Sequence, residues 1–163
     1  MPVEILHFND AKAVLETKKI LQDVTETMNY IEVALSWAHF KGELLRQALD
    51  DCGWRENIPQ LSIIGGRRYL WKGFKRGIAV DGNFSAYEYI LDGLFRLQIG
   101  YDKGRIESGV LMLTSIRSAK SPYGETKEMV IKELAEVYPT ISMPISVALF
   151  NLAHIHQSKG KSD

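Results

Sequence analysis

Hydrophobic side chains recur at intervals of three and four residues through the first third of the chain. The pattern starts at Val14, and its later members are Leu21, Val24, Met28, Ile31, Leu35, Ala38, Leu45, Leu49 and Cys52. This spacing places the apolar side chains on one face of a helix. It predicts a helical part over about residues 10–53, formed by one long helix or by a helix pair broken near residues 27–29. We expect the helical part to cover a sheet along most of its length and to contribute to a subunit interface along part of it.

Short apolar runs separated by glycines follow the helical part. Residues 58–65 and 68–71 are typical of two short strands around a double-glycine turn. The run over residues 77–84 predicts a third strand, in which successive side chains point to opposite faces. This alternation places the polar residues Asp81 and Asn83 together on one face. The other face carries Ile78, Val80 and Phe84.

Helical and strand patterns alternate in the second half of the chain. Helices are predicted over about residues 86–102 and 124–138, where apolar side chains have helical spacing. Strands are predicted over residues 108–114 and 144–150, where continuous apolar runs are typical of strands buried on both faces. The order of the elements predicts a mixed sheet flanked by helices, with parallel crossovers between the later strands.

The helix predicted over residues 86–102 has one seam of small residues at intervals of seven. These residues are Ala86, Gly93 and Gly100. Because the seam has almost no side chains, it predicts very close packing against a sheet or a second helix. The opposite face carries Glu88, Asp92 and Arg96, which are four residues apart. We expect this face to be solvated and Asp92 to pair with Arg96.

The composition indicates an ordinary globular domain. The chain has 163 residues, of which 45% are hydrophobic and 25% are charged, so a single domain over residues 1–163 can bury a substantial core. We expect its sheet and helices over about residues 58–150 and a polar tail over residues 157–163. No apolar run reaches membrane-spanning length, no signal peptide is evident, and the single cysteine suits a reducing compartment. These features predict a cytoplasmic protein without a membrane partner.

Charge gives only a local signal for nucleic-acid binding. Basic and acidic residues number 20 each, so the global basic excess usual in such proteins is missing. Between residues 67 and 76, however, positive charges gather without an acid. The basic residues are Arg67, Arg68, Lys72, Lys75 and Arg76, and the interleaved aromatic residues are Tyr69, Trp71 and Phe74. Such a loop could bind phosphates and stack on bases. A solvated hairpin whose rings face the core is an equal alternative.

Several segments, taken in their order, resemble a known family. They are residues 52–58 (CGWRENI), 77–84 (GIAVDGNF), 95–112 and 144–149 (PISVAL). The resemblance spans roughly residues 30 to 150 and is to the type II restriction endonucleases of the BglII and BamHI group, in the PD-(D/E)xK nuclease superfamily. It implies a restriction-endonuclease-like, three-layer α/β/α fold with a mixed central sheet and a long N-terminal helix or helix pair.

The resemblance also implies an activity and a set of site residues. Members of the family are homodimers that bind DNA and cut both strands at a short palindromic site with a divalent metal, usually magnesium. Two carboxylates hold the metal, and a third polar group positions the attacking water. Asp81 matches the second carboxylate and Asn83 matches the third group, each one methylene shorter than the usual Glu and Gln. Asp81 is therefore the implied metal ligand.

The first carboxylate of the family is missing from this sequence. The family places it roughly ten residues before the second one, close to Lys72, and no acid lies between Glu56 and Asp81. A lysine at that place repels a metal ion. By migration of the ligand, Glu88 on the following helix or Glu43 on the helical part could substitute for it, although Glu88 is more typical of a solvated helix face.

Three functions follow from these residues, and whether the chain is an enzyme stays open among them. The first is a nuclease-fold protein that has lost or greatly weakened magnesium-dependent cleavage, needs no cofactor, and binds nucleic acid or assembles a complex, for example in defence against foreign DNA. The five basic residues between 67 and 76 would then contact phosphates. The second is an active magnesium-dependent DNA endonuclease with a migrated carboxylate. The third is a protein–protein scaffold that does not bind DNA, which the neutral net charge supports.

Overall fold

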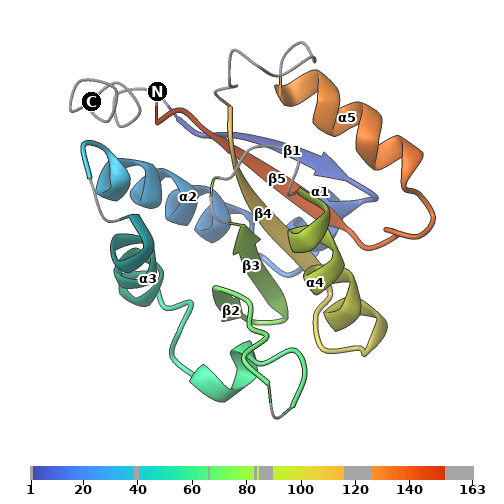
Figure 1. Ribbon diagram of the computed structural model, residues 1–163, viewed down its shortest axis with the longest axis horizontal. Coiled ribbons are helices and arrows are strands. Elements are labelled where there is room, and N and C mark those ends of the chain that lie inside the picture. Colours follow the sequence, from blue (N-terminus) through green and yellow to red (C-terminus); the bar gives the residue numbers. More distant parts are fainter. Residues whose placement is uncertain are drawn as a thin grey trace.

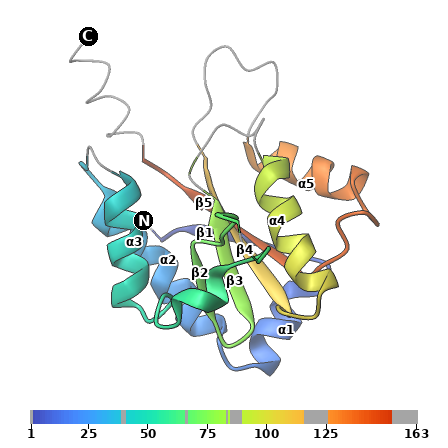
Figure 2. The same ribbon diagram turned by 60° about the horizontal axis from the view of Figure 1, so that its bottom comes forward.

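The computed structural model describes residues 2–38, 41–65, 67–82, 84, 90–115 and 126–152. A central sheet lies between two helical layers, with α2 and α3 on one face and α4 and α5 on the other (Figures 1 and 2). In chain order the elements are β1 (Glu4–Phe8), α1 (Ala11–Thr17), α2 (Leu21–Leu35), α3 (Lys41–Asp51), the 3-10 helix η1 (Ile58–Leu61), β2 (Gly73–Lys75), β3 (Ile78–Gly82), α4 (Ile90–Asp102), β4 (Ser108–Thr114), α5 (Thr126–Glu136) and β5 (Ile145–Phe150). Within the described part of the chain, no helix is long and apolar enough to cross a membrane.

The described residues form a five-stranded mixed sheet with the order β1-β5-β4-β3-β2. The three central strands, β3, β4 and β5, run parallel to one another. The edge strands β1 and β2 are antiparallel to their neighbours, β5 and β3. The central strands are buried at every position, as expected of strands covered by helices on both faces. The predicted α/β class, with a mixed sheet flanked by helices, is therefore confirmed.

The first strand, β1, was not expected from the sequence. It pairs with β5 along its whole length, from Glu4 opposite Leu149 to Phe8 opposite Ile145. The five residues of β1 include a glutamate and a histidine and show no strong local signal for a strand. The extended conformation of β1 is therefore stabilised by pairing with the buried strand β5, which lies far away in the sequence, and not by its local sequence.

The helical part contains three helices among its described residues, where one helix or a pair was predicted. The helices end near residues whose backbone is left-handed, Lys19 at φ 57° and Trp37 at φ 67°. A non-glycine residue in this conformation cannot continue a right-handed helix. The break predicted near residues 27–29 is wrong, because that region lies inside α2. The apolar spacing runs through both real breaks because all three helices bury one face against the same core.

The hairpin lies later in the chain than predicted. The segment expected as a strand over residues 58–65 begins with the 3-10 helix η1, and Pro59 suits the first turn of such a helix. Instead of a second strand over residues 68–71, a single bridge joins Ser62 and Leu70. The true hairpin joins β2 to β3 through Arg76 and Gly77, at φ 51° and 82°. Two residues with positive φ form the tight turn that suits the twist of paired strands.

The sheet separates two hydrophobic cores. Ile78, Val80 and Phe84 lie in the core beneath α1, α2 and α3, and Ala79 lies in the core beneath α4 and α5. The side-chain alternation predicted for this strand is therefore confirmed for its apolar residues. Asp81 is two residues after Ala79, so its side chain points to the same face of the sheet, the face that α4 covers.

Two members of the predicted small-residue seam, Gly93 and Gly100, lie in α4 and pack as closely as predicted, and Ala86 lies outside the described residues. A Cβ atom added to Gly93 would lie 2.5 Å from Cδ1 of Leu111 on β4. A Cβ atom added to Gly100 would lie 2.2 Å from Cζ2 of the buried Trp71. Both distances are far below normal contact, so only glycine allows α4 to approach the sheet and the loop before β2 this closely.

We expect Gly100→Ala to destabilise the protein by about 1–3 kcal/mol, because the new methyl group must displace a packed indole ring. Gly42→Ala is the matched control, since Gly42 lies in α3 with open space around it. It should stabilise the protein by up to about 1 kcal/mol through helix propensity. Urea unfolding of both variants measures the difference, and equal effects of the two substitutions would contradict the packing described for α4.

Candidate functional site

The candidate site is built around Asp81 at the end of β3. Its side chain is only 2% exposed. The next residue, Gly82, has φ 105°, and a Cβ atom there would lie 2.3 Å from the carbonyl oxygen of Met112 on β4. The strand therefore ends on a glycine that no other residue can replace without moving β4, and this fixes the position of the neighbouring carboxylate.

Arg96 of α4 binds the Asp81 carboxylate. Its Nε donates to Oδ2 at 2.6 Å and its Nη2 approaches Oδ1 at 3.4 Å. Oδ1 also accepts the backbone N–H of Gly82 at 2.7 Å. Burial lowers the pKa of Arg96, but the hydrogen bond to Asp81 and the attraction of its charge outweigh burial and raise that pKa. The pair is thus a buried, charge-assisted contact between a helix and the end of a strand.

The predicted pair of Asp92 and Arg96 is therefore wrong. Among the described residues, the ion pair of Arg96 is with Asp81, which lies 15 residues earlier. Asp92 stays close enough to favour the charged guanidinium, although it contributes less than Asp81. Arg96 does not belong to a fully solvated helix face as expected, because its side chain is 26% exposed and reaches back to the sheet.

The aromatic residues near the site belong to the core. Trp71 is buried, and its Nε1 donates to the backbone oxygen of Arg96 at 3.1 Å. Its ring stacks with Phe74 at 6.3 Å between centroids, and both Phe74 and Tyr69 pack against the core beneath α4 and α5. The sequence left two alternatives for these rings, stacking on bases or packing in the core. In the structure they pack against the core.

The described residues do not fit a divalent metal ion at Asp81. Both carboxylate oxygens already accept protein donors. No group of three histidine, cysteine, aspartate or glutamate residues that could hold a metal exists within the described ranges. Glu43 is exposed in the first turn of α3. Within the described ranges it shares no hydrogen bond or ion pair with Asp81. Asn83 and Glu88, the other predicted catalytic residues, lie outside the described residues.

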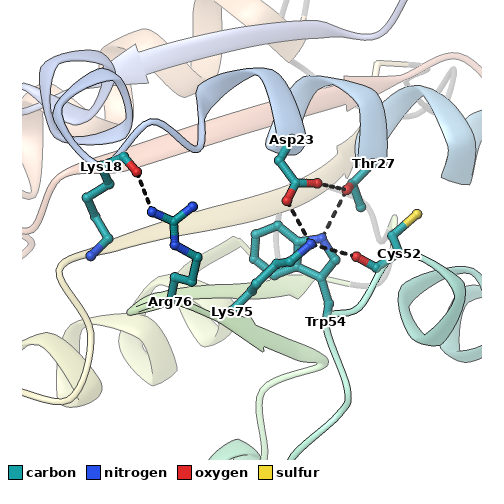
Figure 3. Close-up of polar contacts among 7 residues, drawn as sticks. All are labelled: Lys18, Asp23, Thr27, Cys52, Trp54, Lys75 and Arg76. Atoms are coloured by element: carbon teal, nitrogen blue, oxygen red, sulfur yellow. Dashed lines mark hydrogen bonds and ion pairs between the residues drawn. The ribbon is translucent and has the colours of Figure 1, made fainter.

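Two of the five basic residues, Lys75 and Arg76, donate hydrogen bonds to other parts of the protein (Figure 3). Lys75 Nζ donates to Asp23 Oδ2 at 2.7 Å and to the backbone oxygen of Cys52 at 2.8 Å. The same ammonium lies 5.5 Å from the centre of the Trp54 ring. Arg76 donates to the backbone oxygen of Lys18 at 2.7 Å. These contacts fasten the hairpin to the N-terminal helices.

The other three basic residues have no such role. Arg67 and Arg68 are exposed and Lys72 is half-buried. Across the described part of the chain, none of their side chains forms a hydrogen bond or an ion pair with the protein. We therefore divide the basic cluster into a fastening pair, Lys75 and Arg76, and a free triad, Arg67, Arg68 and Lys72.

An apolar groove lies between α4 and the end of α5. Its volume is about 440 Å³, and it is lined by Leu91, Asp92, Phe95, Glu136, Val137, Tyr138, Thr140 and Ile141. Leu91, Phe95 and Tyr138 are 51%, 59% and 57% exposed. Exposed side chains of this size, gathered in one groove, are typical of a surface that contacts another molecule.

The fold is that of the restriction endonuclease BglII. The structure of BglII complexed with a DNA 16-mer superposes with a TM-score of 0.66 and 18% sequence identity, and the match covers 93% of this chain and 77% of that chain. The structure of free BglII superposes with a TM-score of 0.56 and 17% identity, over 92% of this chain and 79% of that one. No family model and no curated protein matches the sequence. The restriction-endonuclease-like fold that the sequence implied is confirmed.

We expect Lys75→Met to lower the free energy of unfolding by about 1–3 kcal/mol, because Asp23 and the carbonyl of Cys52 lose their donor. Lys72→Met is the matched control, since it removes the same charge from a side chain without a partner in the described residues. Its effect should stay within about 0.5 kcal/mol. Guanidinium unfolding of the two variants gives the comparison. A larger loss for Lys72→Met would contradict the division of the basic cluster.

Proposed function

We propose that this chain is a nucleic-acid-binding protein with a restriction-endonuclease fold that has lost or greatly weakened magnesium-dependent cleavage. The observation that carries the proposal is the contact between Arg96 and the Asp81 carboxylate, with Nε 2.6 Å from Oδ2. Asp81 is the residue that matches the family's second metal ligand. Its oxygens are taken by a guanidinium and a backbone N–H, which leaves it poorly suited to hold a metal.

The sequence before β3 adds to this proposal. Lys72 lies near the position where the family has its first acid, and no acid is found between Glu56 and Asp81. The active-endonuclease alternative needs a carboxylate from elsewhere, and Glu43 and Glu88 are its candidates. Hydrolysis of a phosphodiester with magnesium depends on carboxylate oxygens that can approach the metal. A site with one engaged carboxylate and one nearby lysine disfavours that alternative.

The free triad supports the binding part of the proposal. Guanidinium and ammonium groups without an internal partner can contact phosphate oxygens. The loop that carries the triad leads directly into the hairpin and into β3, which places it beside the candidate site in the chain. Because the net charge is zero, binding would rest on a few local contacts and weaken steeply with salt. The similar BglII structure with a DNA 16-mer suggests duplex DNA as the partner.

We further propose that the protein is cytoplasmic and self-associates through the groove between α4 and α5, either as a homodimer or within a larger complex such as a defence assembly. A two-fold contact brings the same patch of both subunits together, so an apolar patch complements itself. Leu91, Phe95 and Tyr138 form such a patch. This contact also accommodates the scaffold alternative, in which assembly is the whole function.

We expect duplex DNA to bind in EDTA with a marked dependence on salt. The double variant Arg67→Glu/Arg68→Glu should weaken binding at least about tenfold and lower the slope of log K against log salt by about two. Lys132→Glu, an exposed charge reversal on α5, is the control and should bind like the native protein. Fluorescence anisotropy with a labelled duplex measures all three proteins.

Two results would overturn this proposal. The absence of binding at low salt would leave the scaffold function. Cleavage of duplex DNA with magnesium or manganese, if abolished in Asp81→Ala, would establish the endonuclease function instead.

We expect Phe95→Glu to dissociate the dimer, because a charge would replace the most exposed aromatic ring of the groove. A central apolar contact of this kind contributes about 2 kcal/mol, which corresponds to a rise of about 30-fold in the dissociation constant. Ile58→Glu, in the 3-10 helix η1 at 51% exposure, lies outside both the groove and the helical part and should leave association unchanged. Sedimentation equilibrium of the native protein and the two variants measures the three dissociation constants. A monomeric native protein, or equal loss in both variants, would rule out this interface.

A further inference from the structure

We infer that Arg96 is the permanent cation of the Asp81 site and excludes divalent cations from it. The inference rests on the proposed function in one respect, that Asp81 is the remnant of a metal site. It goes further in naming what has replaced the metal, namely the guanidinium of Arg96 on α4.

The geometry leaves room for only one cation at the carboxylate. A divalent cation lies about 2.0–2.6 Å from a carboxylate oxygen. Arg96 Nε lies 2.6 Å from Oδ2, and the backbone N–H of Gly82 is 2.7 Å from Oδ1. A metal ion at Oδ2 would therefore overlap the guanidinium, and the two positive charges would repel each other in surroundings where Coulomb forces are strong. Binding of one excludes the other.

Burial makes a cation necessary at this place. The Asp81 side chain is 2% exposed, so water cannot solvate its charge. A buried carboxylate without a counter-charge is strongly unfavourable. Arg96 meets this need from within the chain. The Arg96 side chain is 26% exposed, so the arginine is the partner of the pair that reaches solvent.

The packing of α4 keeps Arg96 at the site. Gly93 lies three residues before Arg96 and Gly100 four residues after it, and both glycines allow the helix to press against Leu111 and Trp71. Trp71 also donates from Nε1 to the backbone oxygen of Arg96 at 3.1 Å. The turn of α4 that bears the guanidinium is thus fixed from two sides. The cation is part of the fold and is not exchangeable with solution.

Removing the guanidinium should free Oδ2 of Asp81 for a cation from solution. Water molecules would supply the remaining ligands of that cation, because the described residues offer no group of three metal-binding side chains. We expect thermal unfolding of the native protein to be unchanged by millimolar MnCl2. In Arg96→Met the same MnCl2 should raise Tm by about 2–4 °C at a few times the dissociation constant. The double variant Arg96→Met/Asp81→Asn has no carboxylate at the site and should show no rise. Loss of the free Mn²⁺ signal in electron paramagnetic resonance gives an independent measure of binding.

Two further variants make the experiment decisive. Arg96→Ser removes the guanidinium and leaves room for water beside Asp81, so it gives the same test if Arg96→Met does not fold. Arg105→Met is the matched control, because the Arg105 guanidinium bonds the backbone oxygens of Ser62 and Gln60 and its removal uncovers no carboxylate in the described residues. It should respond to MnCl2 like the native protein.

The inference is overturned by either of two results. One is a manganese-dependent rise in the native protein that disappears in Asp81→Asn. The other is the absence of any rise in folded Arg96→Met or Arg96→Ser. These measurements contain no DNA, so they fail or succeed independently of the binding assay that tests the proposed function.

Discussion

The close approach of α4 to the sheet is the constraint on which the rest of the site depends. Glycine at positions 93 and 100 lets the helix pack directly on Leu111 and Trp71. At this distance an arginine of α4 can reach a carboxylate at the end of β3 and remain partly exposed. The guanidinium in turn supplies the counter-charge that the buried Asp81 carboxylate needs. Packing, charge compensation and the chemistry of the site are therefore consequences of one seam of small residues.

The basic residues on the hairpin and in the loop before it illustrate how neighbouring charges can take separate roles. Lys75 is satisfied by a carboxylate, a carbonyl and the face of Trp54, and these contacts stabilise the fold. Arg67 and Arg68 stand in water a few residues earlier, where they are available to a partner. Because charge alone does not distinguish the two roles, the distinction follows only from which carboxylates and carbonyls the fold brings near.

Local patterns were sufficient for much of the fold. Continuous apolar runs located β4 and β5, alternation identified the two faces of β3, and spacing by seven identified the seam of α4. Local patterns could not predict contacts between residues that are distant in sequence. β1 depends on β5, and its His7 contacts Ser146 across 139 residues. Asp92 is the local neighbour of Arg96, yet the tertiary partner Asp81 has the stronger contact. The roles of Asn83 and Glu88 stay predictions, because both lie outside the described residues.

The pairing of β1 with β5 has a consequence for the way the protein is made. Among the described strands, β1 is synthesised first, and its neighbour in the sheet, β5, is synthesised last. The backbone groups on that side of β1 therefore stay unpaired until β5 has emerged from the ribosome. Contacts between such distant segments slow folding. Until β5 is available, β1 is an unpaired strand that favours association with other chains.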